Sequence, residues 1–154
     1  MANTYTQIHI HAIFVVKNRT SLIHKSWETD LYKYIFGIIQ NNSHKAIAIN
    51  GMPDHLHIFF GMRPIQSLSD LIKDIKGSSS KWINAQRFVK SKFSWQPGYA
   101  AFSYSKSHVS RVVQYIKHQK IHHQKQSFSE EYIGFLKGFE IDYDERYIFK
   151  SVLQ

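Results

Sequence analysis

Two histidines, His55 and His57, stand two residues apart in the apolar segment HLHIFFG. Side chains at positions i and i+2 of a β-strand point to the same face, so this spacing places both imidazoles together and suits a single metal ion. A second pair, His9 and His11, has the same spacing in an earlier apolar segment. The pattern alone therefore predicts half of a metal site. It leaves open that either pair simply faces solvent.

Tyr115 and Gln119 stand four residues apart in a segment with helical periodicity. Residues at this spacing share one side of a helix, so a phenol and an amide face the same place. A phenol can act as a nucleophile, and an amide oxygen can bind a cation. The alternative is a solvated Gln119 beside an aromatic residue whose hydroxyl lies in water. The apolar stripe of this helix consists of Val109, Val112, Val113 and Ile116.

Strands and helices that would position these residues follow from the hydrophobic periodicity. The order strand, helix, strand, strand, helix, strand, helix predicts an α+β fold. We expect a ferredoxin-like antiparallel sheet (βαββαβ) with an appended C-terminal helix that carries the tyrosine. The expected strands are 6–16, 45–50, 55–61 and 100–104, and the expected helices are 27–42, one that begins after the cap Ser67, 107–123 and a tail helix at 129–137. Residues 77–80 (GSSS) predict an interruption of the second helix.

Length and composition limit the class of protein. A chain of 154 residues, 43% of them hydrophobic, predicts one domain spanning 1–154. The chain contains no apolar run long enough for a membrane span, and its N-terminus lacks the features of a signal peptide, so we expect a cytoplasmic protein without a membrane partner. Because there is no cysteine, disulfides, thiolate metal sites and cysteine nucleophiles are excluded.

The formal net charge of +9 favours a polyanionic partner, and nucleic acid is the leading candidate. The basic residues are concentrated in residues 1–129, which carry 17 basic and 5 acidic side chains. Aromatic residues make up 15% of the chain and can stack on the bases of single-stranded DNA. For each basic candidate the alternative is a solvated helix face. The candidates for contacts with the DNA backbone are Lys73, Lys76, Lys81, Arg87, Lys90 and Lys92.

The two halves of the predicted site also form a family pattern. The segment GMPDHLHIFF, followed after roughly sixty residues by YIKHQ, resembles the single-tyrosine HUH transposases of the insertion-sequence-200-like (200/605) group, in which U is a hydrophobic residue between two histidines. The similarity covers nearly the whole chain in matching order. It includes the segments IHIHAIFVVKNR, SLSDLIKDIKGSSSKWIN, FSWQPGYAAFSYSKS, HHQKQSFSEEYIGFL and DYDERY.

This resemblance implies a role for each of four residues. His55 and His57 correspond to the family's metal-binding pair, Tyr115 to its nucleophile and Gln119 to its third metal ligand. The implied activity is metal-dependent cleavage and rejoining of single-stranded DNA with hairpin ends, through a covalent 5′-phosphotyrosine intermediate. The implied cofactor is Mg²⁺ or Mn²⁺. The implied assembly is a homodimer with composite active sites, in which the tyrosine helix can complete the metal site of the partner.

Two other functions compete with this interpretation. One is a domesticated relative that binds hairpin DNA or RNA as a regulator without cutting it. The other is a metal-binding ferredoxin-like domain with a hydrolytic or sensory role, in which His9, His11, His55 and His57 share one ion. Replacing Tyr115 by Phe separates these functions, because only a transposase would lose covalent attachment to DNA while it retains its metal.

Overall fold

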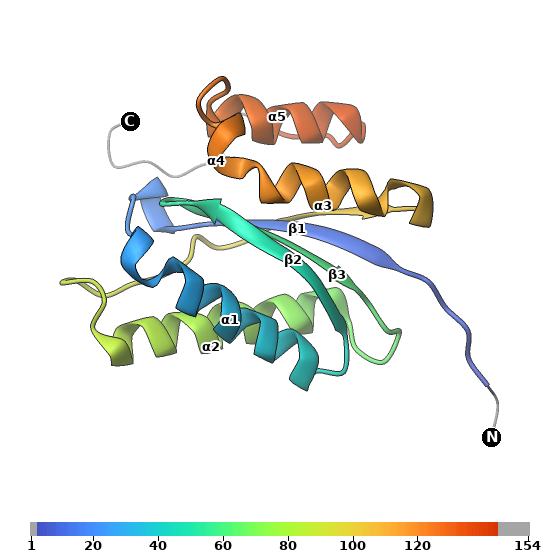
Figure 1. Ribbon diagram of the computed structural model, residues 1–154, viewed down its shortest axis with the longest axis horizontal. Helices are drawn as coiled ribbons and strands as arrows, with labels where there is room; N and C mark the ends of the chain where they lie inside the picture. Colours follow the sequence, from blue (N-terminus) through green and yellow to red (C-terminus); the bar gives the residue numbers. More distant parts are fainter. Residues whose placement is uncertain (1–2, 145–154) are drawn as a thin grey trace.

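The computed structural model describes residues 3–144, which form a four-stranded antiparallel sheet covered by helices on both faces (Figure 1). The strand order is β2-β3-β1-β4, which is the ferredoxin-like arrangement, so the predicted fold class is confirmed. The predicted single domain 1–154 extends beyond the described residues at both ends. The strands are β1 (His9–Val15), β2 (Lys45–Met52), β3 (His55–Gly61) and β4 (Ala100–Tyr104).

The helices are divided between the two faces of the sheet (Figure 1). One face is covered by α1 (Lys25–Asn41) and α2 (Leu68–Gln86). The other is covered by α3 (Val109–Lys117), α4 (Gln119–His122) and α5 (Phe128–Gly138). Short 3₁₀ turns, η1 (Lys17–Arg19) and η2 (Lys106–His108), follow β1 and precede α3. Among residues 3–144, no helix is long and apolar enough to cross a bilayer.

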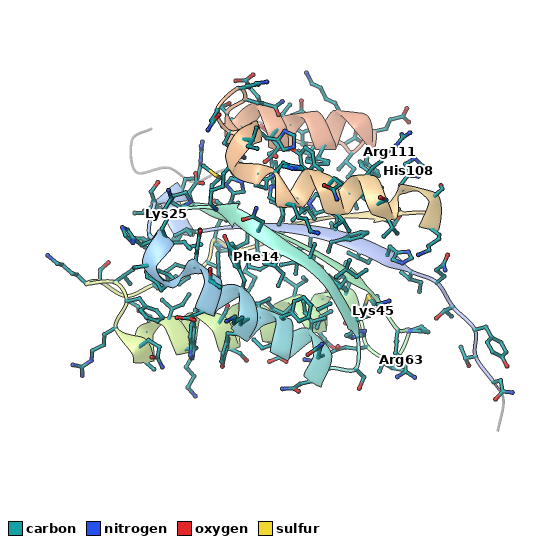
Figure 2. The ribbon with its side chains drawn as sticks, viewed as in Figure 1. Phe14, Lys25, Lys45, Arg63, His108 and Arg111 are labelled. Atoms are coloured by element: carbon teal, nitrogen blue, oxygen red, sulfur yellow. The ribbon has the colours of Figure 1, made fainter. Side chains whose placement is uncertain are left out.

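Strand β3 lies inside the molecule because helices cover the sheet on both sides. Leu56, Ile58 and Phe60 belong to the core shared with α1 and α2, to which Phe14 of β1 also contributes (Figure 2). The alternate residues His55, His57 and Phe59 face the helices of the other layer. Both histidines are fully buried. A buried imidazole needs a partner for each ring nitrogen, so His55 and His57 both require specific polar neighbours.

Helix α2 runs without the interruption expected at residues 77–80. The buried stripe that includes Ile75 and Ile83 continues through this stretch at Ser79, whose hydroxyl accepts a hydrogen bond from the indole nitrogen of Trp95 at 2.9 Å. The Ser80 hydroxyl donates to the carbonyl of Gly77 within the helix. Packing of the stripe against the sheet thus outweighs the low helix propensity of glycine and serine.

The tyrosine helix is shorter than the predicted 107–123. It ends at Lys117, and the chain bends at His118 before α4 begins. The side-chain amide of Asn50, on β2, donates to the carbonyls of Ile116 and Lys117 at 3.0 and 3.1 Å. Two carbonyls at the end of α3 are therefore satisfied by the sheet instead of by a further helical turn. Gln119, the first residue after the bend, is fully buried.

Candidate active site

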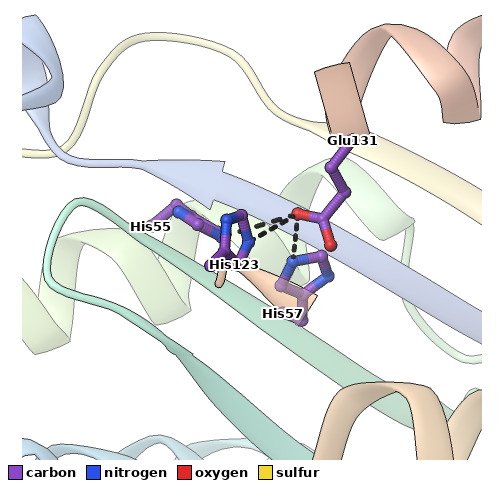
Figure 3. Close-up of side chains that lie close together, drawn as sticks. All are labelled: His55, His57, His123 and Glu131. Atoms are coloured by element: carbon purple, nitrogen blue, oxygen red, sulfur yellow. Dashed lines mark hydrogen bonds and ion pairs between the residues drawn. The ribbon is translucent and has the colours of Figure 1, made fainter. Parts of the chain in front are cut away.

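Four side chains that can ligate a metal ion meet between the sheet and the C-terminal helices (Figure 3). His55 and His57 come from β3, His123 follows α4, and Glu131 lies on α5. One ligand atom from each residue lies within 4.8 Å of all the others. We refer to His55, His57, His123 and Glu131 as the His₃Glu cluster.

One carboxylate oxygen of Glu131 is the centre of this cluster. Oε1 lies 3.1 Å from Nε2 of His57, 3.2 Å from Nε2 of His123 and 3.6 Å from Nε2 of His55. Burial acts to raise the pKa of Glu131, but hydrogen bonds with His123 and His57 outweigh it and hold the pKa well below its usual range. Glu131 is therefore ionised at neutral pH and is a ready oxygen ligand for a cation.

The outer nitrogens of the two β3 imidazoles fix the orientation of the rings. Nδ1 of His55 lies 2.7 Å from a carboxylate oxygen of Asp54, and Nδ1 of His57 lies 2.8 Å from Nε2 of His11. When an ion is bound, a proton on each Nδ1 leaves both Nε2 lone pairs free to face it, as in histidines that bind metals.

Two further properties of His55 fit a cation. Burial lowers the pKa of His55 to about 4, despite its hydrogen bond to Asp54, so the ring is neutral at pH 7 and keeps a free lone pair. Nε2 of His55 is buried and has no hydrogen-bond partner among the described residues. A buried nitrogen of this kind is rare unless it serves a ligand or an ion. The residues present therefore suit a divalent metal.

Tyr115 reaches the same cluster from α3. Its hydroxyl donates a hydrogen bond to Oε2 of Glu131, and its ring stacks on His122 with a centroid distance of 4.5 Å. Burial raises the pKa of Tyr115, and the hydrogen bond to Glu131 and the charge of that carboxylate raise it further. The phenol is thus protonated at neutral pH, and it must lose that proton before it can act as a nucleophile.

Gln119 joins the cluster through both atoms of its amide. Nε2 donates to Oε2 of Glu131 at 3.0 Å, and Oε1 lies 3.2 Å from Nε2 of His123. The structure therefore brings together His55, His57, Tyr115 and Gln119, the four residues singled out from the sequence. It does so within one chain.

The six predicted DNA contacts do not lie at this site. They belong to α2 and to the segment that follows it, on the opposite face of the sheet (Figure 1). There Lys73, Lys76, Lys81 and Lys92 line a hollow of about 760 Å³ together with aromatic residues that include Tyr99. The remaining candidates, Arg87 and Lys90, line an adjacent hollow with Lys92. The ammonium group of Lys76 donates to the carbonyls of Gln96 and Gly98, at 2.6 and 2.8 Å, so part of its bonding capacity is already used.

A smaller hollow of about 310 Å³ lies beside Tyr115. Its walls include the rings of Tyr104 and Phe135, and its lining also includes Arg111 and His108, two side chains at the same end of α3 (Figure 2). The hollow thus combines basic and aromatic side chains next to the tyrosine.

A protein-family model described as "Transposase IS200 like" matches residues 4–119. The chain belongs to this family. The expected family is thereby confirmed, and with it a DNA-processing enzyme. The IS200-like match ends at Gln119, so it includes His55, His57 and Tyr115 but not His123 or Glu131.

Individual relatives agree with this assignment. The ISDra2 transposase TnpA of Deinococcus radiodurans is 27% identical over 118 residues, which cover 73% of this chain and 84% of the relative. A solved structure of a candidate transposase from Deinococcus radiodurans superposes with a TM-score of 0.63 at 23% identity, over 77% of this chain and 95% of the other. A REP-associated tyrosine transposase bound to a REP hairpin superposes with a TM-score of 0.59 at 17% identity, over 80% and 73% of the two chains.

Sequence reasoning about this IS200-like transposase missed His123 and Glu131. Neither residue belongs to the paired patterns that singled out His55, His57, Tyr115 and Gln119. A signal was present, because Ser127 and Glu130 form a capping box that marks the start of α5. Counted from that start, Glu131 lies on the same helix face as Phe128 and Phe135. An acid on the apolar face of a helix is a candidate for a buried functional group.

Proposed function

We propose that this IS200-like transposase cleaves and rejoins single-stranded DNA through Tyr115, next to a divalent metal held by His55, His57 and Gln119. The observation that carries the proposal is the shared carboxylate of Glu131. The Tyr115 hydroxyl is hydrogen-bonded to one of its oxygens, and the other oxygen contacts the paired histidines. The nucleophile and the metal-binding pair therefore meet at one point of a single chain.

Tyr115 would act by a direct displacement at phosphorus. Its phenol oxygen attacks a phosphate of the DNA strand, the bond from phosphorus to the 3′-oxygen breaks, and the departing 3′-oxygen takes up one proton for the one that the phenol loses. The products are a 5′-phosphotyrosine and a free 3′-hydroxyl. When a different 3′-hydroxyl attacks the phosphotyrosine, the tyrosine is released and a new strand is joined. One phosphoester replaces another in each step, so joining needs no ATP.

The metal-binding residues suit this chemistry because neutral imidazoles add no charge that repels DNA. His55 and His57 direct their Nε2 atoms into the cluster, and the amide of Gln119 lies beside them. A Mg²⁺ or Mn²⁺ ion bound there supplies Lewis-acid stabilisation of the phosphate oxygens and of the leaving 3′-oxygen.

The DNA partner is proposed to carry a hairpin. The REP-associated tyrosine transposase with a similar fold is bound to a hairpin, and the basic hollow along α2 offers lysines and aromatic rings for such a structure. The resemblance also predicts a homodimer with composite sites. In the described residues, one chain brings Tyr115 and the metal-binding pair together at Glu131. The dimer stays a prediction, which analytical ultracentrifugation tests.

The first experiment looks for the covalent intermediate. Purified protein is incubated with Mn²⁺ and labelled single-stranded DNAs drawn from hairpins that flank its gene, and the products are separated on a denaturing gel. We expect a protein–DNA adduct that is lost with Tyr115→Phe and with chelator. Tyr34→Phe, which changes a tyrosine on α1, is the matched control and should retain the adduct. Hairpin binding without any adduct, in protein shown to hold its metal, would favour the non-cutting regulator.

A further inference from the structure

We propose that Glu131 and His123 are part of the metal site, and that Glu131 also positions the nucleophile: Oε1 binds the metal and Oε2 holds the Tyr115 hydroxyl. Both residues lie beyond the segment that matches the transposase family. The assignment of Glu131 and His123 as metal ligands does not depend on DNA cleavage. The positioning part rests on the proposed function of Tyr115.

The two oxygens of Glu131 have separate sets of partners. Oε1 lies within 3.6 Å of the Nε2 atoms of all three imidazoles in the His₃Glu cluster. Oε2 accepts hydrogen bonds from the Tyr115 hydroxyl and from the amide of Gln119. A carboxylate with this division can bind an ion on one side while it fixes a phenol on the other.

Burial makes this arrangement expensive without a cation. Glu131 is 3% exposed, and His55 and His57 are fully buried. A buried carboxylate and an unpaired imidazole nitrogen 3.6 Å apart each lose hydration that their mutual contact does not fully replace. A divalent ion between them would satisfy the Nε2 lone pairs and the carboxylate charge together.

Contacts at the start of α5 hold this helix in the position that directs Glu131 toward the cluster. The ring of Phe128 stacks on His55 at a centroid distance of 3.6 Å with an interplanar angle of 7°. The hydroxyl of Ser129 accepts a hydrogen bond from the Arg19 guanidinium at 3.0 Å. Together with the Ser127 cap, these contacts fix the first turn of α5, and Glu131 lies one turn beyond Phe128. The helix that delivers the carboxylate is thus anchored on the metal-binding pair itself.

The donor set determines the class of metal. Three imidazoles and one carboxylate favour transition-metal ions such as Mn²⁺, Co²⁺ or Zn²⁺ over Mg²⁺, which prefers oxygen ligands and retains its water. The choice left open between Mg²⁺ and Mn²⁺ therefore falls on Mn²⁺.

Calorimetric titration of the protein without DNA tests the metal ligands. We expect tighter binding of Mn²⁺ than of Mg²⁺, and a loss of Mn²⁺ affinity of ~10–100-fold or more in Glu131→Gln. Glu130→Gln is the matched control, because Glu130 is an exposed neighbour on the same helix and glutamine can preserve its capping role. Unchanged Mn²⁺ affinity in Glu131→Gln, or tighter binding of Mg²⁺ than of Mn²⁺ to the wild type, overturns this part of the proposal.

X-ray absorption on the Mn²⁺-loaded wild type tests the same point without any variant, so it stays decisive if Glu131→Gln fails to fold. Three coordinated imidazoles are expected. A spectrum with only two coordinated imidazoles would remove His123 from the ligand set and overturn its assignment.

Kinetics of adduct formation at saturating Mn²⁺ test the positioning role. We expect Glu131→Gln to lower kcat by ~100-fold with little change in the KM for DNA, since a small misplacement of a nucleophile is sufficient for such a loss. Glu131→Asp should recover part of the rate, and Glu130→Gln should match the wild type. An unchanged kcat in Glu131→Gln refutes positioning. Absence of any adduct in the wild type would refute the proposed function, while the metal titration would still decide the ligands.

Discussion

The Nδ1 atoms of His55 and His57, on β3, each face a hydrogen-bond acceptor, and the two acceptors differ. Asp54 is a carboxylate, whereas His11 is a second imidazole, reached from the neighbouring strand β1. Burial, and after it the neighbouring His57, lowers the pKa of His11 well below its ordinary value, so His11 is neutral and its Nε2 can accept. The proton of His11 then lies on Nδ1, which is buried without a hydrogen-bond partner among the described residues. This arrangement costs stability and orients His57.

Replacing His11 by Gln should therefore weaken the metal site more than the fold. Loss of a residue that orients a ligand typically lowers metal affinity by ~10–100-fold, and we expect a loss in this range for Mn²⁺. His9→Gln is the matched control, since His9 lies two residues earlier on the same strand face, where its ring stacks on Phe59 away from the cluster. Calorimetry measures both affinities. Equal losses in the two variants would show that any polar change on this strand face disturbs the site.

Single residues were predictable from the sequence where a periodic pattern carried them. The spacing of His55 and His57 and that of Tyr115 and Gln119 each defined a shared face, and the structure brings these four residues together. His11, which a competing interpretation grouped with His55 and His57 around one ion, instead contacts His57 from the neighbouring strand. Glu131 could not be placed in the same way, because its partners lie in elements separated from it by up to 76 residues of chain. Only the packing of α5 brings the carboxylate to them.

Among the secondary-structure elements, the bend between α3 and α4 matters most for the site. Gln119 is the first residue of α4, directly after this bend, and its side chain is fully buried. The bend is held by Asn50 at the end of α3 and by Lys120, whose ammonium group donates to the carbonyl of Gly51 at 2.7 Å. Strand β2, which contributes no member of the His₃Glu cluster, thereby sets where the amide of Gln119 lies.

Asn50→Ala should loosen this bend. It removes two hydrogen bonds to the carbonyls of Ile116 and Lys117, and we expect a loss of about 1–2 kcal/mol in the free energy of unfolding. Urea unfolding in the presence of a chelator measures this loss without a contribution from bound metal. The exposed Asn41, at the end of α1, provides the control Asn41→Ala, which should stay within about 0.5 kcal/mol of the wild type. A similarly small effect of Asn50→Ala would mean that Lys120 alone holds the bend.

The sheet and the order of the elements were more predictable than the continuity and the ends of the helices. Alternating and helical periodicities identified all four strands, including the bounds of β3 and β4, and the order of elements predicted the ferredoxin-like sheet. Two departures have tertiary causes. Burial of Ser79 against Trp95 keeps α2 continuous, and the amide of Asn50 ends α3 early. Neither contact can be inferred from local sequence, because each joins segments that are distant along the chain.

At the scale of the whole molecule, the sheet separates two surfaces with different chemistry. One face of the sheet carries α3, α4 and α5, and the other carries α1 and α2 (Figure 1). The His₃Glu cluster and Tyr115 lie on the first side, and the basic hollow lies along α2 on the second. The proposed metal site uses buried side chains of fixed geometry, whereas the hollow presents exposed lysines that suit the phosphate backbone of a duplex. We therefore expect binding of a hairpin stem and cleavage of a strand to be separable by mutation.

The triple variant Lys73→Gln, Lys81→Gln and Lys92→Gln tests this separation, because these three side chains line the hollow and are exposed. Each lysine that contacts a phosphate releases bound counterions, so the slope of log affinity against log salt should decrease by about 1 for each contact removed. Hairpin affinity should fall, while the rate of adduct formation at saturating DNA stays at the wild-type level. Lys33→Gln, an exposed lysine on α1, is the control for charge alone. If the triple variant binds hairpins with an unchanged salt dependence, the duplex must contact another surface, and the basic residues around the hollow beside Tyr115 would be the next to test.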